Sequence, residues 1–443
     1  MIDTSIRAVR ARPRRLDVLM QVKLTITEGP HHGREFLFDG HETFLVGRSK
    51  DAHFRLPKDD PYFSRRHFLI EANPPRCRIM DLKSRNGTFV NDERVLDVEL
   101  NDGDVIRGGT TTIRVSVIGP QDQDLVMTGS LPGEDEDEDQ FVEAIPCPPP
   151  QGTEYQADLA RPEPAANEKN PIPGYRIDGI VGKGGMGIVY RAMRLADRTQ
   201  VAVKTIQPAS GTNNSASERF FREASILSQL DHPHIVKHYE SGKVGQFIYF
   251  IMELVEGTDA DKILEQGALS VRMGTRLICQ LLKALDYAHS RGFVHRDIKP
   301  SNILIQKLGD RRIVKLADFG LARAYQSAQM SGLTLQGEIR GTIPFMAPEQ
   351  ATHLRKVQPA ADQYSAAATL YNLLTDDFPH DLPPSAAQQV VHIVTEAPIP
   401  IRRRRADIPD ALAQIIHRAL AREPEDRFAD VGTFRRALKP FAE

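Results

Sequence analysis

Two short runs of residues in the second half of the chain carry side chains that handle phosphate and metal ions. Residues 294–302 read Val-His-Arg-Asp-Ile-Lys-Pro-Ser-Asn, and residues 316–320 read Leu-Ala-Asp-Phe-Gly. The first run supplies an Asp to orient a hydroxyl, a Lys to hold a phosphate and an Asn to bind a metal. The second run supplies another Asp for that metal. Because phosphate oxygens repel one another and an incoming hydroxyl, these groups are typical of a phosphoryl-transfer site.

Two further motifs lie upstream of these runs. Residues 182–190 form a glycine-rich segment, and glycines let a backbone approach phosphate oxygens closely. The segment Val-Ala-Val-Lys at 201–204 ends an apolar strand with Lys204. A buried ammonium needs an acidic partner, and Glu223 on a predicted helix over residues 222–230 is the natural one. Alone, each motif could be a hairpin or a surface lysine, but their order with the two downstream runs disfavours that interpretation.

The elements that must position these groups fall in the last region of the chain. Residues 172–441 begin with strand-like segments and continue with helical patterns, such as those over residues 278–288 and 411–421. This order of elements predicts an α+β domain with two lobes. Residues 119–171 contain an acidic run and many prolines but few large apolar residues, so they predict a disordered linker.

The region before the linker has a different pattern. Residues 20–118 contain short strand-like runs, for example 22–27, 43–46 and 112–117, separated by turn dipeptides such as Asn86-Gly87. No segment there has a helical period. We therefore predict a small all-β sandwich, preceded by a basic tail at residues 1–19.

Composition narrows the class of protein. The formal net charge of the 443 residues is −2, so no overall field favours binding to nucleic acid. No apolar run has the length of a membrane span. Three scattered cysteines cannot form a disulfide framework, which favours a reducing compartment and predicts a cytoplasmic protein.

Residues 175–441, which contain all of these phosphate-handling motifs, resemble a serine/threonine protein kinase in the style of the bacterial members of that family. Every segment of the family pattern is present. The resemblance implies that ATP and Mg²⁺, or Mn²⁺ in its place, lie between a small β lobe and a larger helical lobe. Lys299, two residues after Asp297, and Gly341-Thr342 before Ala347-Pro348-Glu349 favour the serine/threonine branch over the tyrosine branch.

The resemblance also implies a role for individual residues. Asp297 would accept a hydrogen bond from the acceptor hydroxyl, and Lys299 would stabilise the transferring phosphoryl group. Asn302 and Asp318 would hold the metal. Lys204 would contact the α- and β-phosphates while paired with Glu223. The other residues expected at the nucleotide are Gly182, Gly184, Gly187, Val189, the gatekeeper Met252, and Glu253 and Val255 through their backbone groups.

Other residues would support the catalytic loop or regulate it. Thr342 would hydrogen-bond near Asp297 and Lys299, whereas His295 and Asp362 would brace the loop. Glu349 would form a structural ion pair with Arg427. Arg296 could pair with a phosphate on the activation segment, for which Thr334 is the best candidate in an autophosphorylating enzyme. The alternative is that Arg296 only braces the loop.

Three polar spots in residues 20–118 are not needed by a plain sandwich. They are Gly47-Arg48-Ser49, Ser64-Arg65-Arg66-His67 and Ser84-Arg85-Asn86-Gly87-Thr88. Arginine and serine side chains on converging loops form a natural phosphate receptor. The ordered set resembles the forkhead-associated (FHA) domain, a β-sandwich that binds phosphothreonine. The resemblance assigns Arg48, Ser64 and Arg65 to the phosphate, and Arg85 and Asn86 to the flanking peptide.

These observations predict an ATP-dependent kinase of protein serine and threonine residues, with an FHA module that recruits phosphothreonine-containing proteins. The recruited protein could be a substrate, a partner or the kinase itself. Two rival hypotheses stay open. The kinase domain could be only a nucleotide-binding switch in a scaffold, although no catalytic position is substituted, or the FHA module could be only a spacer.

Overall fold

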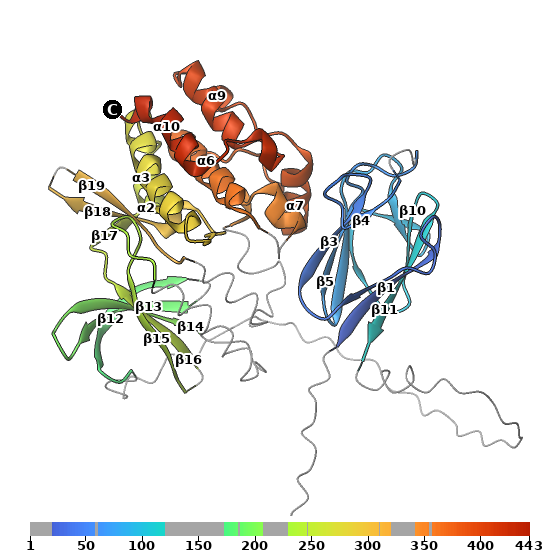
Figure 1. Cartoon of the computed structure of the whole chain (residues 1–443), viewed down its shortest axis with the longest axis horizontal. Coiled ribbons are helices and arrows are strands. Elements are labelled where there is room, and N and C mark those ends of the chain that lie inside the picture. Colours follow the sequence, from blue (N-terminus) through green and yellow to red (C-terminus); the bar gives the residue numbers. More distant parts are fainter. Residues whose placement is uncertain are drawn as a thin grey trace, which may run out of the picture.

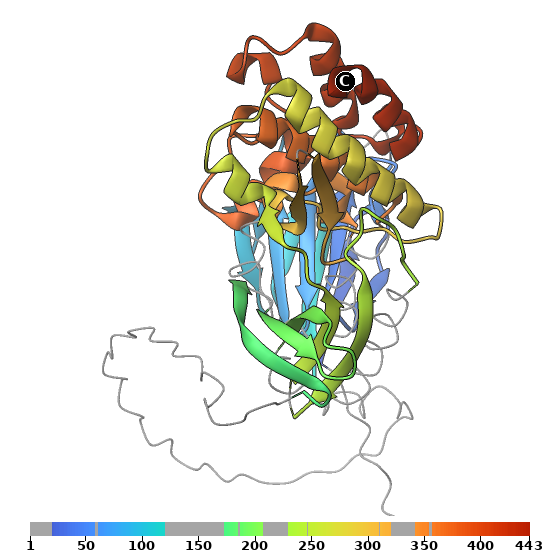
Figure 2. The same ribbon diagram turned by 90° about the vertical axis from the view of Figure 1, so that its left-hand side faces the viewer.

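The structure is a computed structural model that contains a β-sandwich and a two-lobed α+β domain (Figure 1). It describes residues 20–57, 61–119, 172–184, 187–206, 229–245, 247–309, 311–319, 342–353 and 357–443. Seen from the side in Figure 2, a strand-rich lobe lies at one end of the second domain and a helical lobe at the other. The predicted tail over 1–19 and nearly all of the predicted linker over 119–171 lie outside the described residues.

The β-sandwich consists of two antiparallel sheets with one short parallel pair at an edge. The first sheet has the order β2-β1-β11-β10-β7-β8, and the second has the order β4-β3-β5-β6-β9. The strands predicted at 22–27, 43–46 and 112–117 are confirmed as β1, β3 and β11. The eleven strands are β1 (Gln21–Glu28), β2 (Glu35–Phe38), β3 (Glu42–Gly47), β4 (Phe54–Arg55), β5 (Phe68–Asn73), β6 (Arg76–Asp81), β7 (Thr88–Val90), β8 (Glu93–Val95), β9 (Asp97–Leu100), β10 (Val105–Gly108) and β11 (Thr111–Ile118).

The second sheet of the sandwich is buried on both faces. In β5, Phe68 and Ile70 point into the core between the two sheets, whereas Leu69 between them joins an apolar cluster with helices of the kinase-like domain. Because successive side chains of a strand point to opposite faces, a strand covered on both sides reads as a continuous apolar run. Each fully buried leucine on the outer face contributes about 1.5–3 kcal/mol relative to an exposed one.

The small lobe of the second domain is a five-stranded antiparallel sheet with the order β12-β13-β14-β16-β15. Glycine is needed at position 187, where φ is +143° and an added Cβ would lie 1.9 Å from the carbonyl oxygen of Thr205. The start of β13 therefore lies closely against β14. The strands are β12 (Tyr175–Gly184), β13 (Gly187–Arg194), β14 (Gln200–Ile206), β15 (His238–Val244) and β16 (Phe247–Glu253).

The large lobe is built around two helices, α3 (Val271–His289) and α6 (Pro359–Thr375). Helix α3 is amphipathic and begins at Ser270, whose side chain accepts a hydrogen bond from the amide of Met273. It contains the predicted helix over 278–288, and α9 matches the one over 411–421. The other elements are β17 (Gly257–Asp259), α2 (Ala260–Leu264), β18 (Ile303–Leu308), β19 (Arg311–Leu316), α5 (Pro348–Thr352), α7 (Ala386–Thr395), α8 (Ile401–Arg404), α9 (Asp410–Ala419) and α10 (Val431–Ala442).

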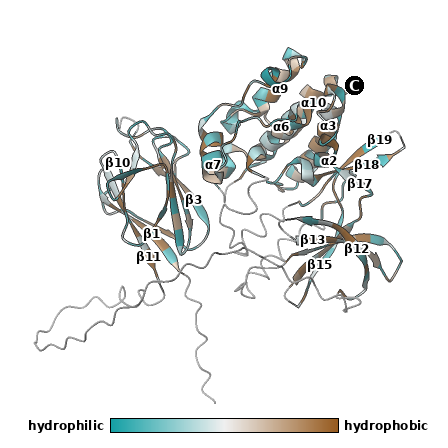
Figure 3. Ribbon diagram, turned by 180° about the vertical axis from the view of Figure 1, so that it is seen from behind, coloured by the Kyte–Doolittle hydropathy of each residue, from teal (hydrophilic) through white to brown (hydrophobic). Residues whose placement is uncertain are grey.

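The two domains contact each other directly, which the sequence did not predict. Strand β3 packs against α5 and β6 against α7, and Figure 3 shows α7 beside β3 from behind. Most of the predicted helix over 222–230 lies outside the described residues. Within the described part of the chain, no helix is long and apolar enough to cross a bilayer.

Candidate phosphoryl-transfer and phosphothreonine sites

A cleft of about 420 Å³ lies between the two lobes of the second domain. Its walls come from the glycine-rich hairpin, the end of β14, the segment after β16 and the two predicted catalytic runs. The structure thus gathers around one cavity residues that lie far apart in the sequence, from Val181 to Asp318. The predicted residues that line it are Gly182, Gly187, Val189, Lys204, Met252, Glu253, Val255, Asp297, Lys299, Asn302 and Asp318. Gly184 pairs with Gly187 at the end of the hairpin.

The floor of the cleft is a hydrogen-bonded group centred on Asp297, which is 8% exposed. Lys299 Nζ lies 3.0 Å from Asp297 Oδ2 and donates to Thr342 Oγ1 over 2.8 Å. Thr342 Oγ1 in turn donates to Asp297 Oδ1 over 3.1 Å. The Nδ2 atom of Asn302 donates to Asp297 Oδ2 over 3.0 Å. The carboxylate of Asp297 is therefore held in one orientation by three side chains.

The roof of the cleft contributes Lys204, which is 6% exposed. Its Nζ lies 2.8 Å from Asp318 Oδ1. Burial disfavours the charged carboxylate, but the neighbouring ammonium outweighs this effect and holds the pKa of Asp318 below its usual value. The predicted partner of the lysine, Glu223, lies outside the described residues. In the described residues Lys204 therefore bridges from the small lobe to the second catalytic run.

The side chains at the end of the β18–β19 hairpin fit a divalent cation. The pairing of Ile303 with Leu316 places Asn302 and Asp318 at the same end of the hairpin, and the amide of Ala317 donates to Asn302 O over 2.9 Å. The amide nitrogen of the Asn302 side chain is already used toward Asp297, so its carbonyl oxygen is the atom that could coordinate a metal. Two oxygen ligands from protein, completed by water and phosphate, match the preference of Mg²⁺.

The catalytic loop is anchored to α6 by the buried carboxylate of Asp362. Its oxygens accept hydrogen bonds from the backbone amides of His295 and Arg296, each 2.7 Å long, and from His289 Nε2 over 2.8 Å. Burial opposes ionisation, but the His289 contact outweighs it and lowers the pKa of Asp362. Arg296 has a φ of +69°, a rare value for a non-glycine residue, so this anchor holds a strained backbone in place.

We expect Asp362→Ala to lower the free energy of unfolding by about 3 kcal/mol, because two buried amides and one histidine lose their acceptor. Since the folded-state pKa of Asp362 is depressed, its contribution is present at neutral pH and is lost as the pH falls through that value. Urea unfolding at pH 7 measures the change. Asp426→Ala, at an exposed carboxylate, is the control and should change stability by less than about 0.5 kcal/mol. Equal effects of the two variants would contradict the anchor.

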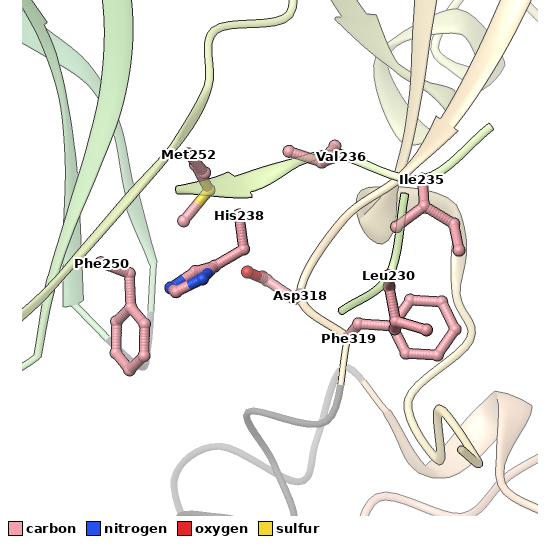
Figure 4. Close-up of a pocket in the computed structure, with 8 residues that line it drawn as sticks. All are labelled: Leu230, Ile235, Val236, His238, Phe250, Met252, Asp318 and Phe319. Atoms are coloured by element: carbon pink, nitrogen blue, oxygen red, sulfur yellow. The ribbon is translucent and has the colours of Figure 1, made fainter. Parts of the chain in front are cut away.

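A second, smaller pocket lies behind Met252 (Figure 4). His238 and Asp318 lie there between Phe250 on one side and Phe319 on the other. Neither ring nitrogen of His238 has a hydrogen-bond partner among the described residues, and burial lowers the pKa of this histidine. The cavity of about 30 Å³ has room for about one water molecule. A neutral histidine therefore closes the back of the cleft.

Sequence reasoning missed several residues of the site. Gln350 donates from Nε2 to the carbonyl oxygen of Arg296 over 2.8 Å and accepts from the amide of Ala347, so it ties α5 to the catalytic loop. Glutamine occurs in many structural settings, so the sequence alone does not assign Gln350 to the site. Its contacts with the catalytic loop are seen only in the structure. Apolar residues from both lobes also line the cleft, and they are Val181, Ala202, Val236, Leu254, Leu304 and Ala317.

Glu253, the last residue of β16, makes contacts within the protein through both its backbone and its side chain. The amide of Glu253 donates to the carbonyl oxygen of Lys237 over 2.8 Å, and its side chain forms an ion pair with Lys315 at 2.7 Å. Its carboxylate therefore ties the two lobes together, while the prediction for Glu253 concerned only its backbone.

The three polar spots of the sandwich converge at one edge of it. The amide of Arg48 donates to Ser64 O over 3.1 Å, and the amide of Arg85 donates to Ser64 Oγ over 2.9 Å. The hydroxyl of Ser64 accepts this bond and can still donate its own proton to a ligand. Glycine is required at position 47, because an added Cβ would lie 2.3 Å from the carbonyl oxygen of Arg65. The predicted phosphate-binding residues therefore share one small surface.

Two neighbouring side chains hold these loops rather than face a ligand directly. His67 Nδ1 accepts from the amide of Ser64 over 3.1 Å, and its Nε2 lies 3.2 Å from the carbonyl oxygen of Gly87. The side chain of Asn86, predicted to contact peptide, donates to the carbonyl oxygen of Tyr62 over 2.9 Å. The side-chain oxygen of Asn86 and its second amide hydrogen are left for a peptide.

Comparisons with known proteins agree with this geometry. The family model for the protein kinase domain matches residues 175–439, and that for the FHA domain matches residues 44–109. The serine/threonine-protein kinase pkn3 of Myxococcus xanthus is 34% identical over 270 residues, which are 60% of this chain and 49% of that protein. The serine/threonine-protein kinase PknB of Mycolicibacterium smegmatis is 35% identical over 271 residues, covering 60% and 42%. The matched region thus spans less than half the length of these relatives.

Solved structures extend the likeness to both domains. A double mutant of the Mycobacterium tuberculosis PknI kinase domain superposes with a TM-score of 0.50 at 28% identity, covering 61% of this chain and 96% of that one. The structure of Rad53 1-466 in complex with AMP-PNP covers 96% of this chain and 100% of its own, with a TM-score of 0.50 at 22% identity, and shows the same fold. The chain therefore belongs to the protein kinase family, as a serine/threonine kinase domain preceded by an FHA domain.

Proposed function

We propose that the protein transfers the γ-phosphate of ATP to serine and threonine residues of other proteins. The observation that carries this proposal is the group of Asp297, Lys299 and Thr342 on the floor of the cleft, opposite Lys204. Asp297 orients the acceptor hydroxyl and accepts its hydrogen bond, while Lys299 stabilises charge on the phosphoryl group. Lys204 binds the α- and β-phosphates.

Asn302 and Asp318 would hold Mg²⁺, with Mn²⁺ as a possible replacement. The metal supplies positive charge that offsets the phosphate oxygens. Adenine would lie between the apolar walls of the cleft and meet the backbone of Glu253 and Val255. The remaining nucleotide-binding residues in this proposal are Gly182, Gly184, Gly187 and Val189, and Glu223 would pair with Lys204 during turnover.

A radiolabelled ATP assay on the full chain with a generic basic protein as substrate tests the proposal. Transfer of label to serine or threonine, dependent on a divalent metal, is expected. If the chain bound ATP but transferred nothing, the rival hypothesis of a nucleotide-binding scaffold would replace it.

We propose that the FHA module binds phosphothreonine through Arg48, Ser64 and Arg65, with Arg85 and Asn86 beside the peptide. Arg48→Ala removes a charge-assisted contact to the phosphate and should weaken binding of a phosphothreonine peptide to the full chain roughly 10- to 100-fold. Fluorescence anisotropy with a degenerate phosphothreonine peptide library measures the change. Arg114→Ala, on a strand of the other sheet, is the matched control. Equal binding of phosphorylated and unphosphorylated peptides would support the spacer hypothesis.

We further propose that Thr334 is the regulatory phosphosite, with Arg296 as the cation that receives its phosphate. Thr334 lies outside the described residues, so the support comes from the sequence alone. Thr334→Ala should lower the kinase rate severalfold, and mass spectrometry should find phosphate at this position in the active enzyme. An unchanged rate together with no phosphate over residues 320–341 would leave Arg296 as a structural brace.

The chain divides, in this proposal, into a basic tail at 1–19, the FHA domain at 20–118, a linker at 119–171 and the kinase domain at 172–441. Its partners are protein substrates and phosphothreonine-containing proteins rather than nucleic acid. Cys77 and Cys279 are free thiols, which supports the reducing environment of the cytoplasm.

A further inference from the structure

The loops of the predicted phosphothreonine site also hold the kinase domain. In the loop that carries Ser64 and Arg65, the next residue, Arg66, bridges Asp51 at 2.7 Å and Glu423 of the kinase domain at 3.0 Å. In the loop that carries Arg85, Lys83 forms an ion pair with Glu396 at the end of α7.

The loop after Arg48 makes a third connection. Here Asp51 accepts, through its backbone carbonyl oxygen, a hydrogen bond of 2.8 Å from His353 Nε2. The ring of His53 lies 4.3 Å from that of His353, measured between centroids. Each of the three loops that carry the predicted phosphothreonine-binding residues therefore has one part that would bind phosphate or peptide and another part in contact with the kinase domain.

Below these loops lies an apolar interface between the domains. The sandwich contributes Leu45, Leu69, Met80 and Leu82, none more than 3% exposed, and α7 contributes Ala387, Val390, Ile393 and Val394. Ile343 belongs to the same cluster, and it directly follows Thr342, which hydrogen-bonds Asp297. The interface thus reaches from the sandwich to the residue beside the catalytic aspartate.

Beside the phosphate-binding loops, arginine side chains of the two domains lie near one another. Arg422 of the kinase domain donates from Nη2 to Thr395 O over 2.6 Å, but its buried Nε has no partner among the described residues. Burial lowers the pKa of Arg422, and the charges of Arg66 and Arg65 across the interface lower it further, while the carboxylates of Glu423 and Glu396 act in the opposite direction. Like charges facing one another oppose docking. A phosphate dianion held at Ser64 and Arg65 would offset this repulsion.

We propose that the kinase domain completes the phosphothreonine site, with Arg422 as an additional cation, so that binding of a phosphothreonine peptide and docking of the FHA domain on α5 and α7 strengthen each other. This inference rests on the proposed phosphothreonine-binding function. Linkage makes the effect reciprocal: docking tightens phosphopeptide binding by the same factor by which the phosphopeptide tightens docking, so a variant that separates the domains loses that factor in peptide affinity.

The test compares variants of the full chain for binding of the phosphothreonine library, without ATP, by fluorescence anisotropy. Arg422→Gln removes the cation, and Ala387→Glu places a carboxylate in the apolar interface. Each should weaken binding about 5-fold or more. The controls make the same charge changes elsewhere: Arg436→Gln on an exposed part of α10 and Gln388→Glu on the exposed face of α7. Both controls should bind like the unchanged chain.

The double variant sharpens the test. Once Ala387→Glu has separated the domains, Arg422 is no longer near the phosphate, so adding Arg422→Gln should weaken binding little further. Hydrogen exchange gives a second readout: the phosphopeptide should slow exchange in α7 of the unchanged chain but not in Ala387→Glu.

The outcomes separate this inference from the function on which it rests. If Arg48→Ala abolishes binding but Arg422→Gln and Ala387→Glu bind normally, the phosphothreonine-binding function is supported and the proposed coupling between peptide binding and docking is wrong. Tighter binding by Ala387→Glu would also overturn it, because docking would then block the site. If the unchanged chain does not prefer phosphorylated peptides, the proposed phosphothreonine-binding function of the FHA domain is itself wrong.

Discussion

Asp297→Asn is expected to lower kcat by about 10²- to 10⁴-fold while the affinity for ATP stays nearly unchanged. The carboxylate lies on the floor of the cleft, where Thr342 and Asn302 fix its two oxygens. Asparagine keeps the size of the side chain but replaces one acceptor oxygen with a donor. The acceptor hydroxyl would then lose the group that orients it, whereas the phosphates are held by other residues.

Steady-state kinetics and ATP titration measure the two effects separately. A loss in kcat with an unchanged dissociation constant for ATP indicates an interaction made in the transition state. Asp261→Asn, near Lys299 but outside this hydrogen-bonded group, is a matched control in the same lobe and should keep most of the rate. Near-normal turnover by Asp297→Asn would remove this residue from the catalytic role.

The proposed catalytic residues stand out in the sequence because the chemistry needs particular side chains at short spacing, and the structure brings them to one cleft. Asp297, Lys299 and Asn302 lie within six consecutive residues, and Asp318 follows after one hairpin. The supporting contacts were harder to predict. Gln350 contacts the catalytic loop, and His289 contacts Asp362, which anchors that loop. Both lie on helices whose position beside the loop cannot be predicted from the sequence.

The contact between the domains was missed for a different reason. A continuous apolar run such as Phe68-Leu69-Ile70 has the length of a strand, and its lack of alternation also indicates a sheet covered on both faces. That signal does not reveal what covers the outer face. The covering surface, on α5 and α7, comes from a part of the chain about 300 residues away and could be identified only in the structure.

The packing of β5 also makes a polar residue unfavourable at position 69. The side chain of Leu69 is fully buried between the sandwich and the kinase domain. In an isolated FHA sandwich the same position would face water, and alternation would favour a polar residue there. The sequence of this strand is therefore adapted to the two-domain chain.

Lys204→Met is expected to abolish measurable phosphoryl transfer while the domain stays folded. The ammonium is the cation of the small lobe that faces Asp318, at 2.8 Å, in the described part of the cleft. Methionine fills a similar volume at the end of β14 and avoids a cavity, but it cannot neutralise phosphate oxygens. In contrast to Asp297→Asn, this variant should lose affinity for ATP as well as rate.

Circular dichroism and thermal unfolding check that the fold of Lys204→Met is intact, and ATP titration measures the lost contact. Lys243→Met is the matched control, since it makes the same substitution at an exposed position of β15 in the same lobe, outside the cleft, and should keep most of the activity. A further consequence follows for Asp318: without the ammonium, burial is opposed only by the weaker influence of His295 and Lys299, so the pKa of the carboxylate should rise. A metal would then bind less readily at neutral pH, so the metal concentration needed for residual activity should rise. If Lys204→Met transferred phosphate at a normal rate and metal requirement, the small lobe would bind the nucleotide in some other way.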